Sequence, residues 1–175
     1  MAGTADPKKP RLDPRLAERL ARKKAQLDRY HPLPSDTVRR LHEDLRVFLT
    51  YHSNAIEGNT LSLRETQMVI DYGLTIGGHP LREYLEATNH AAAYSYMASL
   101  VESRAALTRE TILELHRLVM ERIIEAAGQF RTVPVFIRGA NMTPPPAGRV
   151  EALMREWVAW IGGNGRVRRL LLNLC

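Results

Sequence analysis

Apolar positions recur at three- and four-residue steps along most of the chain, which is the spacing of one buried face of an α-helix. The clearest stripe lies between residues 36 and 59. Its members are Val38, Leu41, Leu45, Phe48, His52 and Ile56. Ser35 or Asp36 can cap the start of this helix, and Gly58-Asn59 is a stop signal. The pattern predicts a long helix over residues 36–59 with one buried face.

Further helical patterns cover residues 14–30, 62–73, 81–101, 108–128 and 150–161. Ser62 followed by Glu65 has the form of a capping box, and Thr108 can cap the helix that begins there. The expected inner side of the 81–101 helix consists of Tyr84, Leu85, Thr88, Ala91, Ala92, Ser95 and Leu100. These patterns together predict an all-helical bundle.

The segment between residues 130 and 146 has a different character, because its middle is β-branched and apolar. Val133, Val135, Phe136 and Ile137 lie close together there, and Pro134 restricts any strand to the edge of a sheet. We expect a short β-hairpin or an extended flap at this place.

Composition and charge limit the class of protein. A chain of 175 residues with 45% hydrophobic and 25% charged residues fits one globular domain, and no apolar run approaches a membrane span. The beginning of the chain has no apolar signal region, and Cys175 is the single cysteine, so we expect a cytoplasmic protein. The net charge of +6 allows nucleic-acid binding, but the aromatic content of 6% gives little support for base stacking.

Residues 163–169 read Gly-Asn-Gly-Arg-Val-Arg-Arg, and an apolar, helix-like run follows them. Gly163 and Gly165 around Asn164 allow a turn whose N–H groups point at an anion, at a helix N-terminus that also favours phosphate. Arg166 and Arg169 are three residues apart and can bind two phosphate oxygens from one helix face. The run predicts a polyphosphate cradle; an ordinary loop before a solvated basic helix is the alternative.

Three segments together resemble the Fic (Fido-fold) family of protein adenylyltransferases. Residues 163–169 resemble the second half of its motif, His-Pro-Phe-x-Asp/Glu-Gly-Asn-Gly-Arg-x-x-Arg. Residues 53–59, with Ser53 and Glu57, are similar to its inhibitory motif, Ser/Thr-x-x-x-Glu-Gly/Asn. The stretch 128–146 is similar to its flap, and the resemblance runs from about residue 36 to the end of the chain.

The resemblance implies an all-α, Fic-like helical bundle with a short β-hairpin flap, in truncated form. It implies a basic lead and helix over residues 1–35 and a Fic-like domain over 36–175. Within that domain lie the inhibitory helix (36–59), the flap (130–146) and a partial Fic motif (162–169). Family members transfer AMP from Mg·ATP to a hydroxyl side chain of a target protein, so the resemblance implies ATP, Mg²⁺ and a protein partner.

The family roles transfer to individual positions of this sequence. Asn164 and the amides of Gly163 and Gly165 would form an anion hole, and Arg166 and Arg169 would bind phosphates. Glu57 would pair with Arg169 and take the place of the γ-phosphate, which makes it autoinhibitory. The flap residues Val133, Val135, Phe136 and Ile137 would align the target segment by β-augmentation.

The sequence departs from the family where the chemistry is done. Counting back from Gly163, the histidine position holds Val158, the phenylalanine position Trp160 and the acidic position Gly162. We therefore assign no catalytic and no metal-binding residue, and we expect the chain to have lost an internal helix and the end of the bundle. Nothing in the sequence places any of the six histidines, His31, His42, His52, His79, His90 and His116, beside Gly163.

Three functions remain open from the sequence. The favoured one is an autoinhibited Fic-type adenylyltransferase that is inactive as given. The second is a non-catalytic regulator that binds a nucleotide or a partner, and the least favoured is a basic helical nucleic-acid binder. Loss of a central helix would leave apolar faces uncovered, which favours aggregation or a homodimer.

Overall fold

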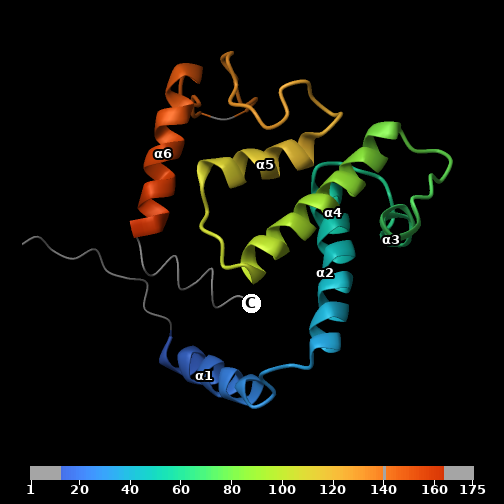
Figure 1. Ribbon diagram of the computed structural model, residues 1–175, viewed down its shortest axis with the longest axis vertical. Coiled ribbons are helices and arrows are strands. Elements are labelled where there is room, and N and C mark those ends of the chain that lie inside the picture. Colours follow the sequence, from blue (N-terminus) through green and yellow to red (C-terminus); the bar gives the residue numbers. More distant parts are fainter. Residues whose placement is uncertain (1–12, 140, 164–175) are drawn as a thin grey trace, which may run out of the picture. The chain divides into compact units, whose positions relative to one another are not determined.

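The structure is a computed structural model that describes residues 13–139 and 141–163. All regular secondary structure in these ranges is helical, which confirms the predicted fold class (Figure 1). The helices are α1 (Pro14–Asp28), α2 (Ser35–Ile56), α3 (Leu63–Tyr72), α4 (Leu81–Glu102), α5 (Arg109–Met120) and α6 (Ala147–Gly163). No helix in the described ranges is both long and apolar enough to cross a membrane. The chain divides into two compact units, residues 1–42 and 43–175.

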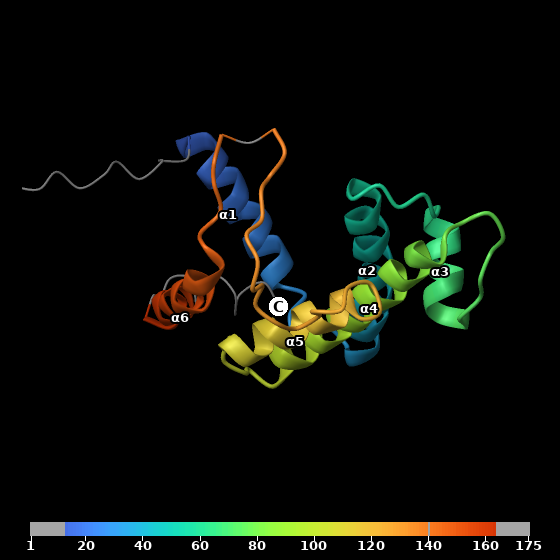
Figure 2. The same ribbon diagram turned by 90° about the horizontal axis from the view of Figure 1, so that it is seen from above.

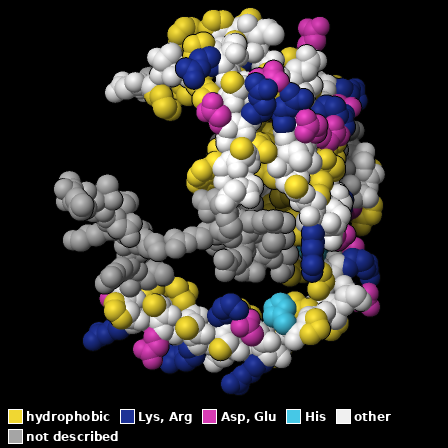
Figure 3. Space-filling view, turned by 60° about the vertical axis from the view of Figure 1, so that its left-hand side comes forward, with side chains coloured by type: hydrophobic (Ala, Val, Ile, Leu, Met, Phe, Trp, Pro, Cys, Tyr) yellow, Lys and Arg dark blue, Asp and Glu magenta, His cyan; other side chains and the backbone are white. Residues whose placement is uncertain are grey.

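In the first unit, α1 begins with a side-chain cap. The Asp13 carboxylate accepts hydrogen bonds from the backbone N–H groups of Arg15 and Leu16, at 2.8 and 3.2 Å, and Pro14 opens the first turn. None of its residues is buried. Figure 3 shows its hydrophobic side chains in the open among lysine and arginine side chains.

The second unit is organised around α4, which contacts α3 along one part and α5 along another; α5 in turn contacts α6 (Figures 1 and 2). The core cluster comprises Leu61, Val69, Tyr84 and Ala87, so it lies where α3 and the segment before it meet α4. Ala87 is the one small residue of this cluster, and it is fully buried. This core joins the segment after α2 to the first half of α4.

The predicted inner side of α4 is partly wrong. Tyr84 and Ala91 are buried as expected, but Thr88, Ala92 and Ser95 are exposed. The buried positions also include Ala87, Asn89 and Ala93. Because α3 and α5 contact different sides of α4, its buried surface is not a single stripe.

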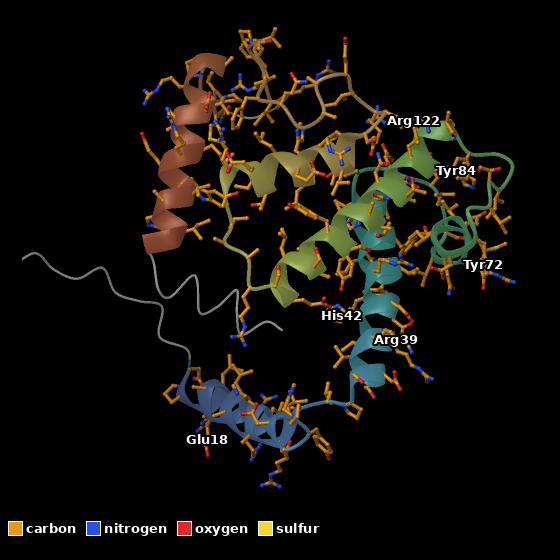
Figure 4. The ribbon with its side chains drawn as sticks, in the orientation of Figure 1. Glu18, Arg39, His42, Tyr72, Tyr84 and Arg122 are labelled. Carbon is orange, nitrogen blue, oxygen red and sulfur yellow. The ribbon has the colours of Figure 1, made fainter. Side chains whose placement is uncertain are left out.

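The capping predictions for α3 and α5 are confirmed. The Ser62 hydroxyl accepts from the Glu65 N–H at 3.3 Å, and the Glu65 carboxylate accepts from the Ser62 N–H at 2.8 Å. The Thr108 hydroxyl caps α5, with Thr111 as the reciprocal partner. However, α5 ends at Met120, before the expected Gly128, and turns that include Arg122 at φ 61° follow (Figure 4).

The predicted buried stripe of α2 is wrong for the described part of the chain. Leu41, Phe48 and Ile56 are 48%, 49% and 83% exposed, and His52 is exposed as well. The side of α2 that meets other described residues is polar instead. The Thr50 hydroxyl is fully buried against His90, and Arg46 pairs with Asp71 of α3 at 3.0 Å.

The predicted β-hairpin is absent from the described residues, whereas the extended alternative agrees with them (Figure 2). The Arg131 guanidinium donates to the carbonyl oxygens of Val133 and Pro145, and so ties together the two ends of this loop. An isolated two-stranded hairpin is marginally stable, and Pro134 has no N–H to donate to a partner strand. These two facts explain why β-branched composition alone did not produce strands.

Candidate functional site

The end of α2 carries the first candidate motif. The Asn54 carbonyl accepts from the backbone N–H groups of Glu57 and Asn59, both at 3.0 Å, and Gly58 adopts φ 94°. This positive φ closes the helix at the residue after Glu57, as the stop signal predicts. The Glu57 side chain is exposed and makes no ion pair or hydrogen bond with residues 13–139 or 141–163. Ser53, the other predicted inhibitory residue, is half-buried one turn earlier.

Two contacts fix the half of α2 that leads to Glu57. The Thr50 hydroxyl lies 2.8 Å from His90 Nδ1 on α4, and Arg46 is ion-paired with Asp71 on α3. Both contacts come from the polar side of the helix. The Glu57 end of α2 is therefore held in place by the rest of the second unit, while its carboxylate faces solvent.

The predicted flap residues form a second candidate surface. Val133, Val135, Phe136 and Ile137 are all exposed, and Phe136 most of all. No other described backbone pairs with this segment, apart from the Arg131 contacts at its base. The segment thus offers backbone donors and acceptors together with apolar side chains, which are the requirements for binding an extended peptide.

The third candidate region is the end of α6. Val158, Trp160 and Gly162 all lie inside this helix, which extends through Gly163. Val158 is half-buried, whereas Trp160 and Gly162 are exposed. The remaining residues of the predicted cradle, Asn164, Gly165, Arg166 and Arg169, lie outside the described residues. No trio of histidine, cysteine, aspartate or glutamate side chains within 13–139 and 141–163 is arranged to hold a metal ion.

The histidines of the second unit have structural partners. His116 Nδ1 accepts from the Gly128 N–H at 3.0 Å, and Thr60 and two carboxylates surround His79. The ring of His52 makes edge contacts with Phe48 and Tyr51. Burial lowers the pKa of His90, which is bonded to Thr50. Each of these rings is therefore accounted for by local structure.

The depressed pKa of His90 predicts acid sensitivity. The folded state binds this proton less readily than the unfolded state, so the stabilisation is present above the ordinary histidine pKa and is lost as the pH falls. We expect the urea midpoint to fall between about pH 7.5 and pH 5. His90→Asn, which keeps an acceptor near Thr50, should flatten this decline, whereas His31→Gln, at an exposed site, should not. An equally steep decline in both variants would contradict the assignment.

Asn89 is a structurally important residue that the sequence analysis missed. Its side-chain amide donates to the carbonyl oxygens of Val119, at 3.2 Å, and Glu121, at 2.7 Å. Asn89, which lies on α4, thereby caps the carboxyl end of the neighbouring helix α5. An asparagine inside a helical pattern was the available signal, since asparagine is a poor helix former unless its side chain finds a partner.

Comparison with known proteins gives a consistent family. Residues 106–162 match the Fic/DOC family. The "Protein adenylyltransferase Fic" of Culex quinquefasciatus is 29% identical over an alignment of 192 residues. The alignment covers 93% of this chain and 38% of that protein. The protein of the same name from Aedes aegypti is 30% identical over 196 residues, with the same two shares. The chain thus spans 38% of the length of these curated relatives.

Solved structures show similarity to the same family. A Fic family protein from Desulfovibrio desulfuricans G20 is 30% identical, with a TM-score of 0.67 over 88% of this chain and 47% of that one. Fic-1 from C. elegans is 28% identical, with a TM-score of 0.63 over 92% and 58%. A Fic domain containing signaling protein from Bacteroides thetaiotaomicron, at 22% identity and a TM-score of 0.73, shows the same fold.

Proposed function

Because the chain belongs to the Fic/DOC family, we propose that it is a nucleotide-binding relative of the protein adenylyltransferases that cannot transfer AMP as given. The observation that carries this proposal is the course of α6. The helix runs without interruption from Ala147 through Gly163. Counted back from Gly163 in the sequence, the positions of the family's histidine and acidic residue fall within this helix, at Val158 and Gly162. Valine cannot accept the proton of a target hydroxyl, and glycine has no carboxylate for Mg²⁺.

A lost internal segment accounts for both replacements. The stretch matched to the Culex protein, 192 residues, is longer than this whole chain of 175. That relative therefore contains residues inside the matched stretch that have no counterpart here. We assign the loss to the helix that would end in His-Pro-Phe. Within residues 13–139 and 141–163, no group of three ligating side chains is arranged to hold Mg²⁺.

Glu57 is the proposed inhibitory residue, with Ser53 one turn before it. The fixed end of α2 leaves this carboxylate exposed and without a partner among residues 13–139 and 141–163, which supports a role toward the segment that follows α6. There it would pair with Arg169 and compete with the γ-phosphate of ATP. ATP itself would be bound by Gly163, Asn164, Gly165, Arg166 and Arg169.

The proposal assigns the flap a protein partner. The exposed Val133, Val135, Phe136 and Ile137 supply the backbone and apolar side chains for β-augmentation by an extended segment. The exposed apolar stripe of α2 supports a second copy of the chain as a further partner.

Labelled ATP tests the proposed loss of activity. The full chain, incubated with Mg²⁺ and ATP labelled in the α-phosphate, is expected to transfer no label to itself or to other proteins, because the general base is missing. Transfer that disappears in Arg169→Ala would overturn this part of the proposal.

Calorimetric titration with ATP tests the binding part. Glu57→Gln removes the competing charge and should tighten ATP binding about tenfold, which corresponds to about 1.4 kcal/mol. Glu102→Gln is the matched control, since it makes the same change at the end of another helix and should leave the affinity unchanged. Arg169→Ala should abolish binding. Equal affinities in the native chain and Glu57→Gln would contradict the inhibitory role.

A further inference from the structure

The residues that follow Glu57 are fastened to the first two turns of α4. The side-chain amide of Asn59 donates to the Glu83 carbonyl oxygen and to Glu86 Oε2, both at 3.0 Å. The backbone N–H and the hydroxyl of Thr60 both donate to Glu83 Oε2, at 2.9 and 2.8 Å. The Glu83 carboxylate therefore sets the position of Thr60, three residues after Glu57.

His79, in the loop before α4, lies between two carboxylates. Its Nδ1 is 3.3 Å from Glu83 Oε2 of α4, and its Nε2 is 3.5 Å from Glu65 Oε1 of α3. The three side chains are only 15%, 13% and 28% exposed, in the order His79, Glu83 and Glu65. The rings of His79 and Tyr84 are nearly perpendicular, with their centroids 6.2 Å apart, and the Tyr84 hydroxyl donates to the Ile76 carbonyl in the same loop. Figure 4 labels Tyr84 near the start of α4.

Both carboxylates are charged at neutral pH. Hydrogen bonds from Ser62, first of all from its backbone N–H, hold the pKa of Glu65 below its ordinary value. Burial raises the pKa of Glu83, but hydrogen bonds from Thr60 and the nearby His79 outweigh it, so this pKa is also lowered. Two negative charges therefore face the imidazole of His79.

The hydrogen atoms available at this cluster restrict how the ring of His79 can be bonded. The Thr60 hydroxyl donates to Glu83 Oε2, so its oxygen can only accept from His79 Nδ1, which lies 2.9 Å away. A neutral ring with its hydrogen on Nδ1 then directs the lone pair of Nε2 at the Glu65 carboxylate. The imidazolium carries a hydrogen on both nitrogens and satisfies Thr60, Glu83 and Glu65 together.

We propose that His79 acts as a proton-dependent clasp, that is, a contact between Glu65 and Glu83 that holds the segment following α2 in place only when His79 is protonated. When protonated, it joins Glu65 to Glu83 and holds Thr60, and with it the helix end that carries Glu57. When His79 loses its proton, the contact to Glu65 becomes repulsive and the 59–62 segment is held less firmly. His79 is a positioning residue in this scheme; its consequence for inhibition rests on the proposed function of Glu57.

Amide hydrogen exchange on the full chain tests the clasp without reference to activity. The protection factor of the Thr60 N–H, which reports its bond to Glu83, is expected to fall about tenfold between about pH 5.5 and pH 8.5. The neutral variant His79→Gln should show low protection over the whole range, and His79→Lys, which keeps a positive charge, should show high protection throughout. His31→Gln should behave like the native chain.

Two outcomes would overturn the clasp. One is a Thr60 protection factor that changes with pH in His79→Gln as it does in the native chain. The other is low protection in His79→Lys at every pH. The link to Glu57 is tested separately by ATP titration: His79→Gln should change the ATP affinity of the native chain but not that of Glu57→Gln. A pH-dependent Thr60 signal with no such difference keeps the clasp and refutes the inhibitory role of Glu57.

Discussion

Replacing Asn89 with leucine is expected to lower the free energy of unfolding by about 3 kcal/mol, because two carbonyl groups lose their donor. The Asn89 amide is the side-chain partner of the Val119 and Glu121 carbonyls at the end of α5. Asn89 is buried, so water has little access to take its place. Leucine has the same number of side-chain heavy atoms as asparagine, branched at the same carbon, which keeps a cavity from contributing. Urea unfolding followed by circular dichroism measures the change.

Thr88→Leu is the matched control for this substitution. Thr88 is the preceding residue of α4 and is exposed, and among the described residues its hydroxyl donates to carbonyls of its own helix. It should shift the stability by less than about 0.5 kcal/mol, as is usual for surface positions. Equal urea midpoints for Asn89→Leu and the native chain would show that the two hydrogen bonds contribute nothing net.

Asn89 also matters for the candidate site. The turn that follows Glu121 leads through Gly128 to the loop with the flap residues, and His116 holds the Gly128 N–H from inside α5. A frayed α5 would therefore release the base of the flap. One asparagine on α4 connects the stability of the second unit to the surface proposed for the protein partner.

Features that depend on neighbouring residues could be predicted from the sequence. The capping box of Ser62 and Glu65, the Thr108 cap and the Gly58 stop all involve side chains within three or four residues of the backbone groups they serve. The same holds for the motif around Glu57, whose position at the end of a helix follows from local turn chemistry.

Features that depend on distant parts of the chain could not be predicted in this way. The apolar stripe of α2 pointed to a buried face, but burial also requires a partner, and the described partners of α2 bind its polar side through Thr50 and Arg46. The cluster around His79 draws on the segment after α2, on α3 and on α4. Periodicity within one helix holds no information about such contacts.

The proposed function and the clasp meet at the core beside Thr60. Leu61, the next residue, is buried against Val69 of α3 and against Tyr84 and Ala87 of α4. The polar contacts of Asn59 and Thr60 therefore lie directly beside an apolar cluster. Apolar packing brings the segment to α4, and the carboxylates with His79 then determine how its backbone is oriented.

The second large effect is expected at Ala87, the most deeply buried side chain of that cluster. Ala87→Leu adds three carbon atoms where α3 and the 59–62 segment approach α4, and there is no free surface into which they can turn. Overpacking of this kind costs about 2–3 kcal/mol, since neighbouring side chains or backbone must shift. Urea unfolding should show the loss, and the Thr60 N–H should exchange faster as its segment moves away from Glu83.

Ala92→Leu separates this steric effect from any general effect of leucine on α4. Ala92 lies on the same helix but is exposed, so the added carbons meet solvent and the stability should change by less than about 0.5 kcal/mol. Similar urea midpoints for the two variants would mean that the packing between α3 and α4 accommodates the larger side chain at little cost in stability. A large loss at Ala87 alone, together with faster exchange at Thr60, would show that the fixed position of the Glu57 helix end depends on close packing at this crossing.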